Sequence, residues 1–427
     1  MEFITYLQQC LKDHLSEIVA DYEGKIEASD LLEIEDAVKR MTHEFGNEVM
    51  REILEAQEAQ YPAETSKCPH CGQEAQYQRR RQGMVITLQG RVYYQRSYYL
   101  CRHCQQGHYP LDEQLGIHPG QMSQAVVKIA AVVGVQTGFE TSRDLLARTT
   151  QLELSANSIR QACHQVGEVV LCNEAEQITT SQDLAEQLAQ KHKSGPKRLY
   201  GSLDGFQGPF RDGWHEVKGG VWWQVDEQGR AYHKTYYADT CQAADLSDLV
   251  WASGFARQAD QAEELIFVAD GADWIWRLVA EHFPQAVQIV DWYHASSYLP
   301  PVADETFSDE ITRQDWLEQT KTALWAGDLK TVIAACREHI RPQLAVDKDP
   351  AQKAVRYFTN HRHRMDYATY RAKGYQIGSG TMESACKQLG VGRLKITGAR
   401  WLKTGGRLVT KARTAYLSGQ WDQLKIA

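Results

Sequence analysis

Short apolar runs between residues 198 and 290 constrain the fold of this 427-residue chain more than any other feature. We expect strands at Arg198–Leu203, Val217–Val225, Ala231–Tyr237, Leu265–Ala269 and Val287–Val290, with helices at Leu246–Phe255 and Trp274–Phe283. Three consecutive strands followed by alternating helices and strands predict an α/β domain. By analogy at the level of the fold, the order β-β-β-α-β-α-β is that of an RNase H-like core.

Acidic residues stand at the ends of these elements. Asp204 follows the first strand, Asp270 follows the strand Leu265–Ala269, and Glu383 lies in the first turn of a helix expected to begin near Thr381. Open α/β sheets place their sites at the carboxyl ends of strands. Each acid alone is explained equally well as a cap or turn residue. The three together favour a site for two Mg²⁺ or Mn²⁺ ions and phosphoryl transfer.

Four motifs together resemble one known family. They are Tyr200-Gly-Ser-Leu-Asp204-Gly, Val268-Ala-Asp270-Gly-Ala, Asp291-Trp-Tyr-His294 and Ile377-Gly-Ser-Gly-Thr-Met-Glu383-Ser. This combination resembles the insertion-sequence transposases of the ISKra group, which are distantly similar to the Mutator-type transposases. The resemblance extends over nearly the whole chain and includes its basic ending, Gly398-Ala-Arg-Trp401.

The resemblance implies a DDE transposase that cuts the terminal inverted repeats of its own insertion sequence and joins them to target DNA. It implies that Asp204, Asp270 and Glu383 are the catalytic, metal-binding triad, and that residues 303–372 are an all-helical insertion in the core. His294 is a candidate to contact the scissile phosphate or to orient a metal ligand. A hydrogen-bonded histidine at a packed strand end explains His294 equally well.

Two cysteine pairs predict a second, structural metal site. Cys68-Pro-His-Cys71 and Cys101-Arg-His-Cys104 have the spacing of a four-thiolate zinc module, and the residues between them predict a hairpin around Gln89-Gly90. We expect one structural Zn²⁺ ion bound by Cys68, Cys71, Cys101 and Cys104.

Basic residues gather in three places that suit DNA. Between the cysteine pairs they alternate with tyrosines, although the tyrosines also suit the packed face of a hairpin. A candidate helix-turn-helix spans Ser142–Val170, where an ordinary packed helix pair is the alternative. The stretch from Ser384 to Trp421 contains basic residues and no acid, which favours DNA contact. The usual alternative for such a run is a basic surface exposed to solvent. The candidate DNA contacts are Arg79, Arg80, Arg81, Arg160, Lys387, Arg393, Lys395, Arg400 and Lys403.

The pattern along the chain predicts six segments. They are a helical region (1–62), a zinc-ribbon-like module (63–115), a helical, possibly helix-turn-helix region (116–195), the first part of the core (196–302), the helical insertion (303–372) and the glutamate helix with its basic tail (373–427). The net charge of −8 argues against a protein that coats DNA non-specifically, but it does not exclude DNA binding. Without a membrane-length apolar run or a signal peptide, we expect a cytoplasmic protein with no membrane partner. Because a transposase must bind both ends of its element together, we expect a homodimer or a larger homo-oligomer.

Three alternatives stay open. A domesticated, non-catalytic, zinc-dependent DNA-binding protein would retain the modules but not the cutting. A nuclease of the same fold would share only the first chemical step. A tyrosine-nucleophile enzyme is suggested by His361-Arg-His363 with Tyr367 and Tyr370, but that segment is expected to be helical.

Overall fold

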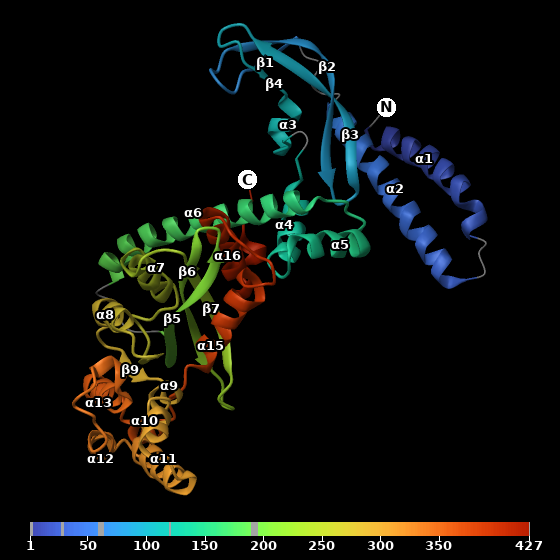
Figure 1. The fold of residues 1–427 in the computed structure, drawn as a ribbon. Helices are drawn as coiled ribbons and strands as arrows, with labels where there is room; N and C mark the ends of the chain where they lie inside the picture. The colour runs from blue at the N-terminus through green and yellow to red at the C-terminus, as the bar shows by residue number, and fades with distance from the viewer. Residues whose placement is uncertain (1–2, 27–29, 59–63, 119–120, 189–194, 427) are drawn as a thin grey trace. The chain divides into compact units, whose positions relative to one another are not determined.

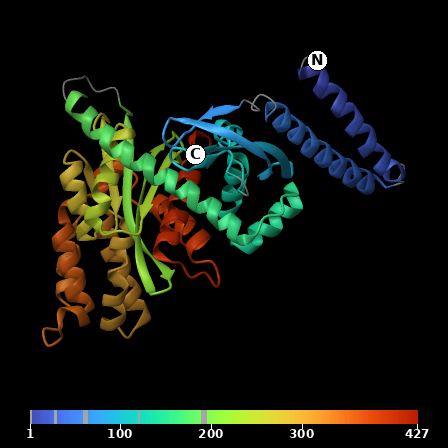
Figure 2. The ribbon, with the colours of Figure 1, turned by 90° about the horizontal axis from the view of Figure 1, so that it is seen from above.

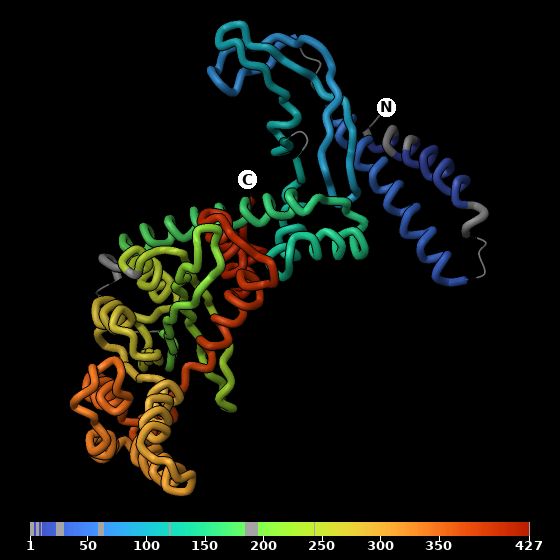
Figure 3. The backbone as a smooth tube through the Cα atoms, viewed as in Figure 1, coloured from blue at the N-terminus to red at the C-terminus, as the bar shows by residue number. Residues whose placement is uncertain are grey.

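The computed structural model describes residues 3–26, 30–58, 64–118, 121–188 and 195–426, shown as a ribbon in Figure 1 and as a tube in Figure 3. The chain forms two compact units, residues 1–166 with 425–427, and residues 167–424. Each unit has a sheet of its own, so the fold class is mixed α/β with two sheets and many helices.

The first unit combines a helical region with a long hairpin. Its sheet has the order β1-β2-β3-β4, and α2 packs on β3. The hairpin turns at Gly90, whose φ of +90° suits glycine, so the predicted strands around Gln89-Gly90 are confirmed. The elements are α1 (Phe3–Ile26), α2 (Leu31–Glu58), β1 (Thr65–Lys67), β2 (Glu74–Thr87), β3 (Gly90–Cys101), β4 (Gly107–His108), α3 (Pro110–Leu115), α4 (Gln124–Gly134), α5 (Phe139–Thr150) and the start of α6 (Ala156–Leu188).

The second unit is built on a five-stranded sheet with the order β7-β6-β5-β8-β9. The pairs β5–β6 and β6–β7 are antiparallel, while β5–β8 and β8–β9 are parallel. The elements of this core are β5 (Arg198–Phe210), β6 (Gly213–Val225), β7 (Ala231–Asp239), α7 (Ala243–Ala256), β8 (Glu264–Ala269), α8 (Asp273–His282) and β9 (Val287–Val290). All five strands and both helices expected from the sequence are therefore present.

Helices fill the chain between β9 and the C-terminal segment, as expected for residues 303–372. They are α9 (Trp292–Ser296), α10 (Leu299–Thr306), α11 (Glu310–Trp325), α12 (Leu329–Arg337), η1 (Val346–Lys348), α13 (Pro350–His361), η2 (Arg362–Arg364) and α14 (Tyr367–Ala372). The segment His361–His363 is helical, as predicted against the tyrosine-nucleophile alternative. Tyr367 is fully buried and donates its hydroxyl hydrogen to the Val290 carbonyl, so it is not placed to attack DNA.

The helix expected from Thr381 does not run on as one basic helix. It is divided into α15 (Gly380–Cys386), the π-helical η3 (Lys387–Leu394), a loop, α16 (Lys403–Leu417) and η4 (Trp421–Gln423). Glycines at 390, 392 and 398 interrupt this stretch, and glycine disfavours a continuous α-helix.

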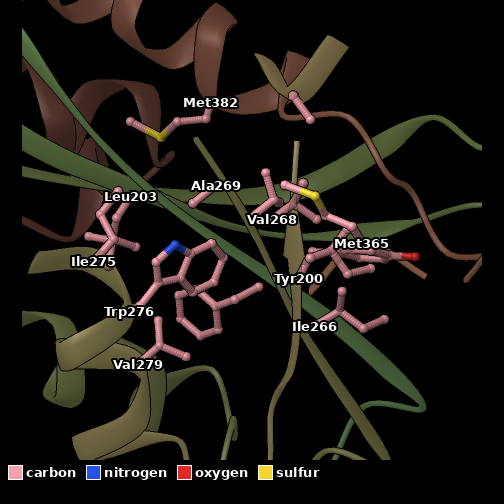
Figure 4. Close-up of a cluster of buried hydrophobic side chains, with 14 of the residues drawn as sticks. Tyr200, Leu203, Ile266, Val268, Ala269, Ile275, Trp276, Val279, Met365 and Met382 are labelled. Atoms are coloured by element: carbon pink, nitrogen blue, oxygen red, sulfur yellow. The ribbon is translucent and has the colours of Figure 1, made fainter. Parts of the chain in front are cut away.

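Buried hydrophobic side chains pack against both faces of the sheet in the second unit and form its core (Figure 4). Trp222 packs against Phe267 and Phe283, on the face that α7 and α8 cover (Figure 2). Met382 of α15 is 1% exposed and belongs to the same core. Because Met382 anchors α15 to the sheet, its neighbour Glu383 is held close to the strand ends.

Candidate functional site

Three aspartates lie in one row across the sheet: Asp204 lies within β5, which continues beyond the predicted strand end, and Asp270 and Asp291 directly follow β8 and β9. Partners differ by 66 in residue number between β5 and β8, and by 21 between β8 and β9. Continued along the strands, this register sets Asp204 beside Asp270, and Asp270 beside Asp291. A parallel sheet directs its carboxyl ends to one edge, so the row lies where such folds place their sites. We call Asp204, Asp270 and Asp291 the aspartate row.

Asp204 is half-buried and contacts the helix that carries Glu383. Its Oδ2 lies 3.5 Å from the Cys386 Sγ, and its Oδ1 accepts a hydrogen bond from the Gly205 N–H at 2.7 Å. Burial raises the pKa of Asp204, the Gly205 N–H lowers it, and the charge of Asp270 raises it again, leaving it above its usual value. Two carboxylates this close repel one another, and a bound cation would relieve that repulsion.

Asp270 is held by the helical insertion. Its carboxylate accepts a hydrogen bond from the Ala272 N–H at 2.9 Å, and its carbonyl accepts one from the Tyr357 hydroxyl at 2.6 Å. The next residue, Gly271, has a φ of +107°, and a Cβ there would lie 2.8 Å from the Tyr357 hydroxyl oxygen. Glycine is therefore needed at this point for two reasons, backbone conformation and close approach.

Asp291 ties the row to the segment that precedes Glu383. One of its oxygens accepts the His294 N–H at 2.6 Å and caps α9, while the other accepts the Ser379 N–H. The Trp292 N–H donates to the Ile377 carbonyl at 2.9 Å. Asp291 is only 4% exposed, so its carboxylate serves as a structural link. The Asp-x-x-His motif thus has a role that does not require chemistry.

His294 lies in an aromatic group next to the row. Its ring centroid is 5.7 Å from that of Tyr298 and 6.0 Å from that of Tyr357, and the two tyrosine rings are stacked at 4.0 Å. A charge on His294 would lower the pKa of Asp204, which places the imidazole within electrostatic range of the row. The arrangement fits either of the two roles considered for His294.

Glu383 sits on the correct helix but its carboxylate turns outward. Its side chain is 66% exposed and forms an ion pair with Lys387 at 2.6 Å. Among the described residues, only the four paired cysteines gather into a group of three or more metal-ligating side chains with ligand atoms within 4.8 Å. Glu383 would reach the row only after its side chain rotates toward Asp204, which Cys386 of the same helix already contacts.

The four paired cysteines form a compact group that could hold a zinc ion. The sulfur atoms of Cys68 and Cys104, and those of Cys71 and Cys101, lie 3.6 Å apart. Tetrahedral zinc with Zn–S bonds of about 2.3 Å needs sulfur–sulfur edges of about 3.8 Å. The Cys104 and His103 N–H groups lower the pKa of the Cys101 thiol, whereas burial and the neighbouring thiols raise the pKa of Cys71. A bound Zn²⁺ ion would stabilise the thiolate form of the group.

The arginines between the cysteine pairs have two different environments. Arg79 and Arg80 are exposed, and the Arg81 guanidinium lies 4.0 Å from the ring centroid of Tyr98. Arg96, in contrast, is buried and forms an ion pair with Asp112. Three arginines of this hairpin are thus available to a partner, whereas Arg96 stabilises the module.

The predicted helix-turn-helix has helices at the expected positions. Ser155 caps α6 by accepting the Ser158 N–H at 3.0 Å, as the sequence indicated. Arg160 is half-buried and donates to the Asn157 side chain at 2.6 Å. The second helix continues to Leu188, however, so it is far longer than a recognition helix requires.

The basic C-terminal stretch is only partly a surface. Arg393 is 1% exposed with its guanidinium 4.8 Å from the ring centroid of Trp401, so the expectation that it contacts DNA is corrected. Lys387 and Lys403 are more than 60% exposed, although Lys403 pairs with Asp212 at 2.9 Å. Arg400 is exposed and Lys395 is half-buried. These four remain candidates.

No helix among the described residues has the length and apolar character needed to cross a membrane. Residues 26–193 match the model of an uncharacterised protein family, UPF0236. The chain is also similar to two UPF0236 proteins of Caldanaerobacter subterraneus subsp. tengcongensis. One is 21% identical over 97% of this chain and 85% of the relative. The other is 20% identical over 91% of this chain and 78% of the relative.

Proposed function

We propose that this chain, whose residues 26–193 match the model of the uncharacterised UPF0236 family, is a DDE transposase. It would cut the DNA at the ends of its own mobile element and join those ends to target DNA, using bound divalent ions. The observation that carries the proposal is the parallel register that sets Asp204 beside Asp270, with the Glu383 helix packed on β5.

The topology of the second unit supports the same proposal. Its strand order, with three antiparallel strands followed by two parallel ones, is the order expected of an RNase H-like core. The helical stretch between Asp270 and Glu383 would then be an insertion into that core.

One relative adds an argument of a different kind. The printed name of the second Caldanaerobacter protein carries eleven locus labels. A single protein encoded at many places in one genome is expected of a sequence that copies itself. A mobile element fits this observation better than a housekeeping enzyme does.

The donor set fits a hard divalent ion at Asp204 and Asp270. Both offer carboxylate oxygens from adjacent positions of neighbouring strands, and the charge of Asp270 raises the pKa of Asp204. Glu383 completes the set after a side-chain rotation away from Lys387. When bound, Mg²⁺ or Mn²⁺ would activate the attacking oxygen and stabilise the leaving one. Asp291 would hold the Glu383 segment in place, and His294 would face the phosphate.

Basic residues that are exposed or half-buried would bind the DNA backbone. In the second unit these are Lys387, Lys395, Arg400 and Lys403, and in the first unit Arg79, Arg80 and Arg81. Such contacts carry affinity that falls with salt, while the carboxylates carry the chemistry. Binding and cutting are therefore separable.

The test is cleavage of a labelled duplex copied from the DNA that borders the protein's own gene. We expect nicking or joining with Mg²⁺ or Mn²⁺ and none with EDTA. Glu383→Gln should lower the cleavage rate by on the order of 100-fold or more, because it removes a metal ligand and not merely a supporting contact. DNA affinity of this variant should change little.

Glu227→Gln is the matched control, since Glu227 is exposed in the turn between β6 and β7. Cutting by Glu383→Gln at the wild-type rate would exclude the carboxylate mechanism. Tight, zinc-dependent DNA binding by a wild-type protein that never cuts would instead favour a domesticated DNA-binding protein. Cutting without joining would favour a nuclease of the same fold.

A further inference from the structure

A pocket of about 570 Å³ opens between α9 and α11. Trp292 and Tyr293 line it from α9. Every α11 residue that lines it comes from one helical face, with spacings of three and four residues. Those residues are Gln314, Leu317, Glu318, Lys321, Thr322 and Trp325. The pocket therefore has aromatic walls and a rim that carries both hydrogen-bond donors and acceptors.

The aromatic walls are held in fixed orientations although they are open to solvent. The Arg371 guanidinium lies 3.9 Å from the ring centroid of Trp325 and donates to the Trp325 carbonyl at 3.0 Å. Trp292 meets Trp325 edge-on at 5.1 Å and Tyr293 edge-on at 5.3 Å. Tyr293 is nevertheless 71% exposed and Trp325 41% exposed. Large aromatic groups that are rigid and exposed together are typical of a binding surface.

The pocket adjoins the aspartate row through a short stretch of chain. Tyr293 lies between Asp291, a member of the row, and His294, whose ring is 6.0 Å from that of Tyr357, the residue that donates to the Asp270 carbonyl. A Cβ placed on Gly378 would lie 3.1 Å from the Tyr293 ring, so this ring packs on the segment that leads to Glu383. A ligand group in the pocket would belong to a molecule that also reaches the carboxylates.

We propose that this pocket holds a single nucleobase, unstacked from the DNA beside the phosphate at the aspartate row. The inference rests on the proposed function and adds a specific contact to it. Aromatic side chains stack on the face of any base, and each such contact stabilises single-stranded DNA appreciably. The amide of Gln314, the carboxylate of Glu318 and the ammonium of Lys321 complement the mixed polar edge of a base. An apolar peptide would leave this rim without partners.

The test combines two pocket variants with a substrate that lacks one base. Tyr293→Ala and Trp325→Ala should each weaken binding and slow cleavage of the intact duplex by roughly 5- to 150-fold, the loss of one stacked base. A single abasic position, moved along the nucleotides that flank the cut, should abolish this difference at one position only. There, wild type and variants should bind and cut equally, because the pocket has no base to hold.

Tyr232→Ala is the matched control, because Tyr232 is 48% exposed on β7 and does not line the pocket. Trp325→Phe should restore most of the loss, since it keeps an aromatic face. If each variant unfolds at the same temperature as wild type, misfolding is excluded as the cause of weaker binding and slower cleavage. Wild-type cleavage by both alanine variants would overturn the proposal, and so would a deficit that persists at every abasic position.

Affinity measurements on the same duplexes separate this inference from the proposed function. If wild type never cuts, the transposase proposal fails, but the abasic scan of binding still tests the pocket. If wild type cuts and the scan shows no position-specific rescue, only the base pocket fails.

Discussion

Among single residues, the three members of the aspartate row differ in what surrounds them. Asp291 is almost fully buried, and both of its oxygens accept main-chain hydrogen bonds. Asp204 is half-buried beside a thiol and a second carboxylate, so it has unused acceptor capacity. The row is therefore divided into one structural carboxylate and two that remain available to a ligand.

A first prediction concerns the cysteine group. Cys71→Ser should remove the zinc ion and lower the thermal unfolding temperature of the first unit, because structural zinc supplies folding free energy. Zinc content by mass spectrometry and an unfolding scan test this directly. Cys172→Ser is the control, since Cys172 is exposed and outside the group. Retention of one zinc per chain at an unchanged unfolding temperature would contradict the assignment.

Sequence patterns identified the ligand cysteines and the strand-end acids because each depends only on local spacing. They did not reveal Cys386, Tyr357 or the Asp291–Ser379 bond. These contacts join residues separated by 87 or more positions in sequence, and no local pattern specifies such pairs. The spacing of Cys386, three residues after Glu383 on one helix, was the available signal for the first of them.

Among the elements, α16 shows why counting charges overestimated the exposed basic surface. Lys411 is fully buried and pairs with Glu174 at 2.6 Å and Asp239 at 3.0 Å. Arg407 makes two hydrogen bonds to the same Asp239 carboxylate. These ion pairs attach α16 to β7 and α6. Some basic residues of this stretch are therefore buried. The stretch itself contains no acid, and the acidic partners Glu174 and Asp239 lie elsewhere in the chain, so local sequence did not reveal these pairs.

A second prediction follows from this ion-pair group. Burial alone would raise the pKa of Asp239, but Arg407 and Lys411 outweigh it and hold the pKa below its usual value. The stabilisation is therefore present above the unfolded-state pKa of about 4 and is lost as the pH falls through the lower folded-state value. Asp239→Asn should destabilise the second unit by about 3–5 kcal/mol at pH 7, because it leaves Lys411 buried with one partner fewer.

Denaturant unfolding at a series of pH values tests this prediction. The difference between wild type and Asp239→Asn should shrink below about pH 4. Glu140→Gln is the control, since Glu140 pairs with Arg143 on the surface and such pairs contribute about 1 kcal/mol or less. A pH-independent difference would show that shape, and not charge, accounts for the loss.

Strand prediction succeeded because the apolar runs of the core are short and separated by clear turns. The predicted strands ended at Leu203 and began again at Val217. In the structure β5 continues to Phe210 and β6 begins at Gly213, because polar and glycine residues continue the hairpin between them. Those residues are held by pairing across the hairpin and by a bridge from Phe210 to Trp401. Tertiary hydrogen bonds of this kind override weak local preference.

For the whole molecule, the two units have separate sheets and separate cores. The cysteine group belongs to the first unit, and the large hydrophobic cluster belongs to the second. A zinc chelator should therefore lower one unfolding transition and leave the other in place. Differential scanning calorimetry, with limited proteolysis to identify the part that unfolds first, would measure both. A single transition that shifts as a whole would contradict this independence.

The hydrogen bond from Tyr357 to the Asp270 carbonyl has a consequence for engineering this protein. The helical stretch between β9 and α15 begins and ends near the same sheet edge, so a short linker is an obvious replacement for it. Yet its tyrosine covers Gly271 and holds the main chain at the aspartate row. A miniaturised variant without α13 would lose the side chain that packs on Gly271 beside the aspartate row, so attempts to shorten this protein should begin elsewhere.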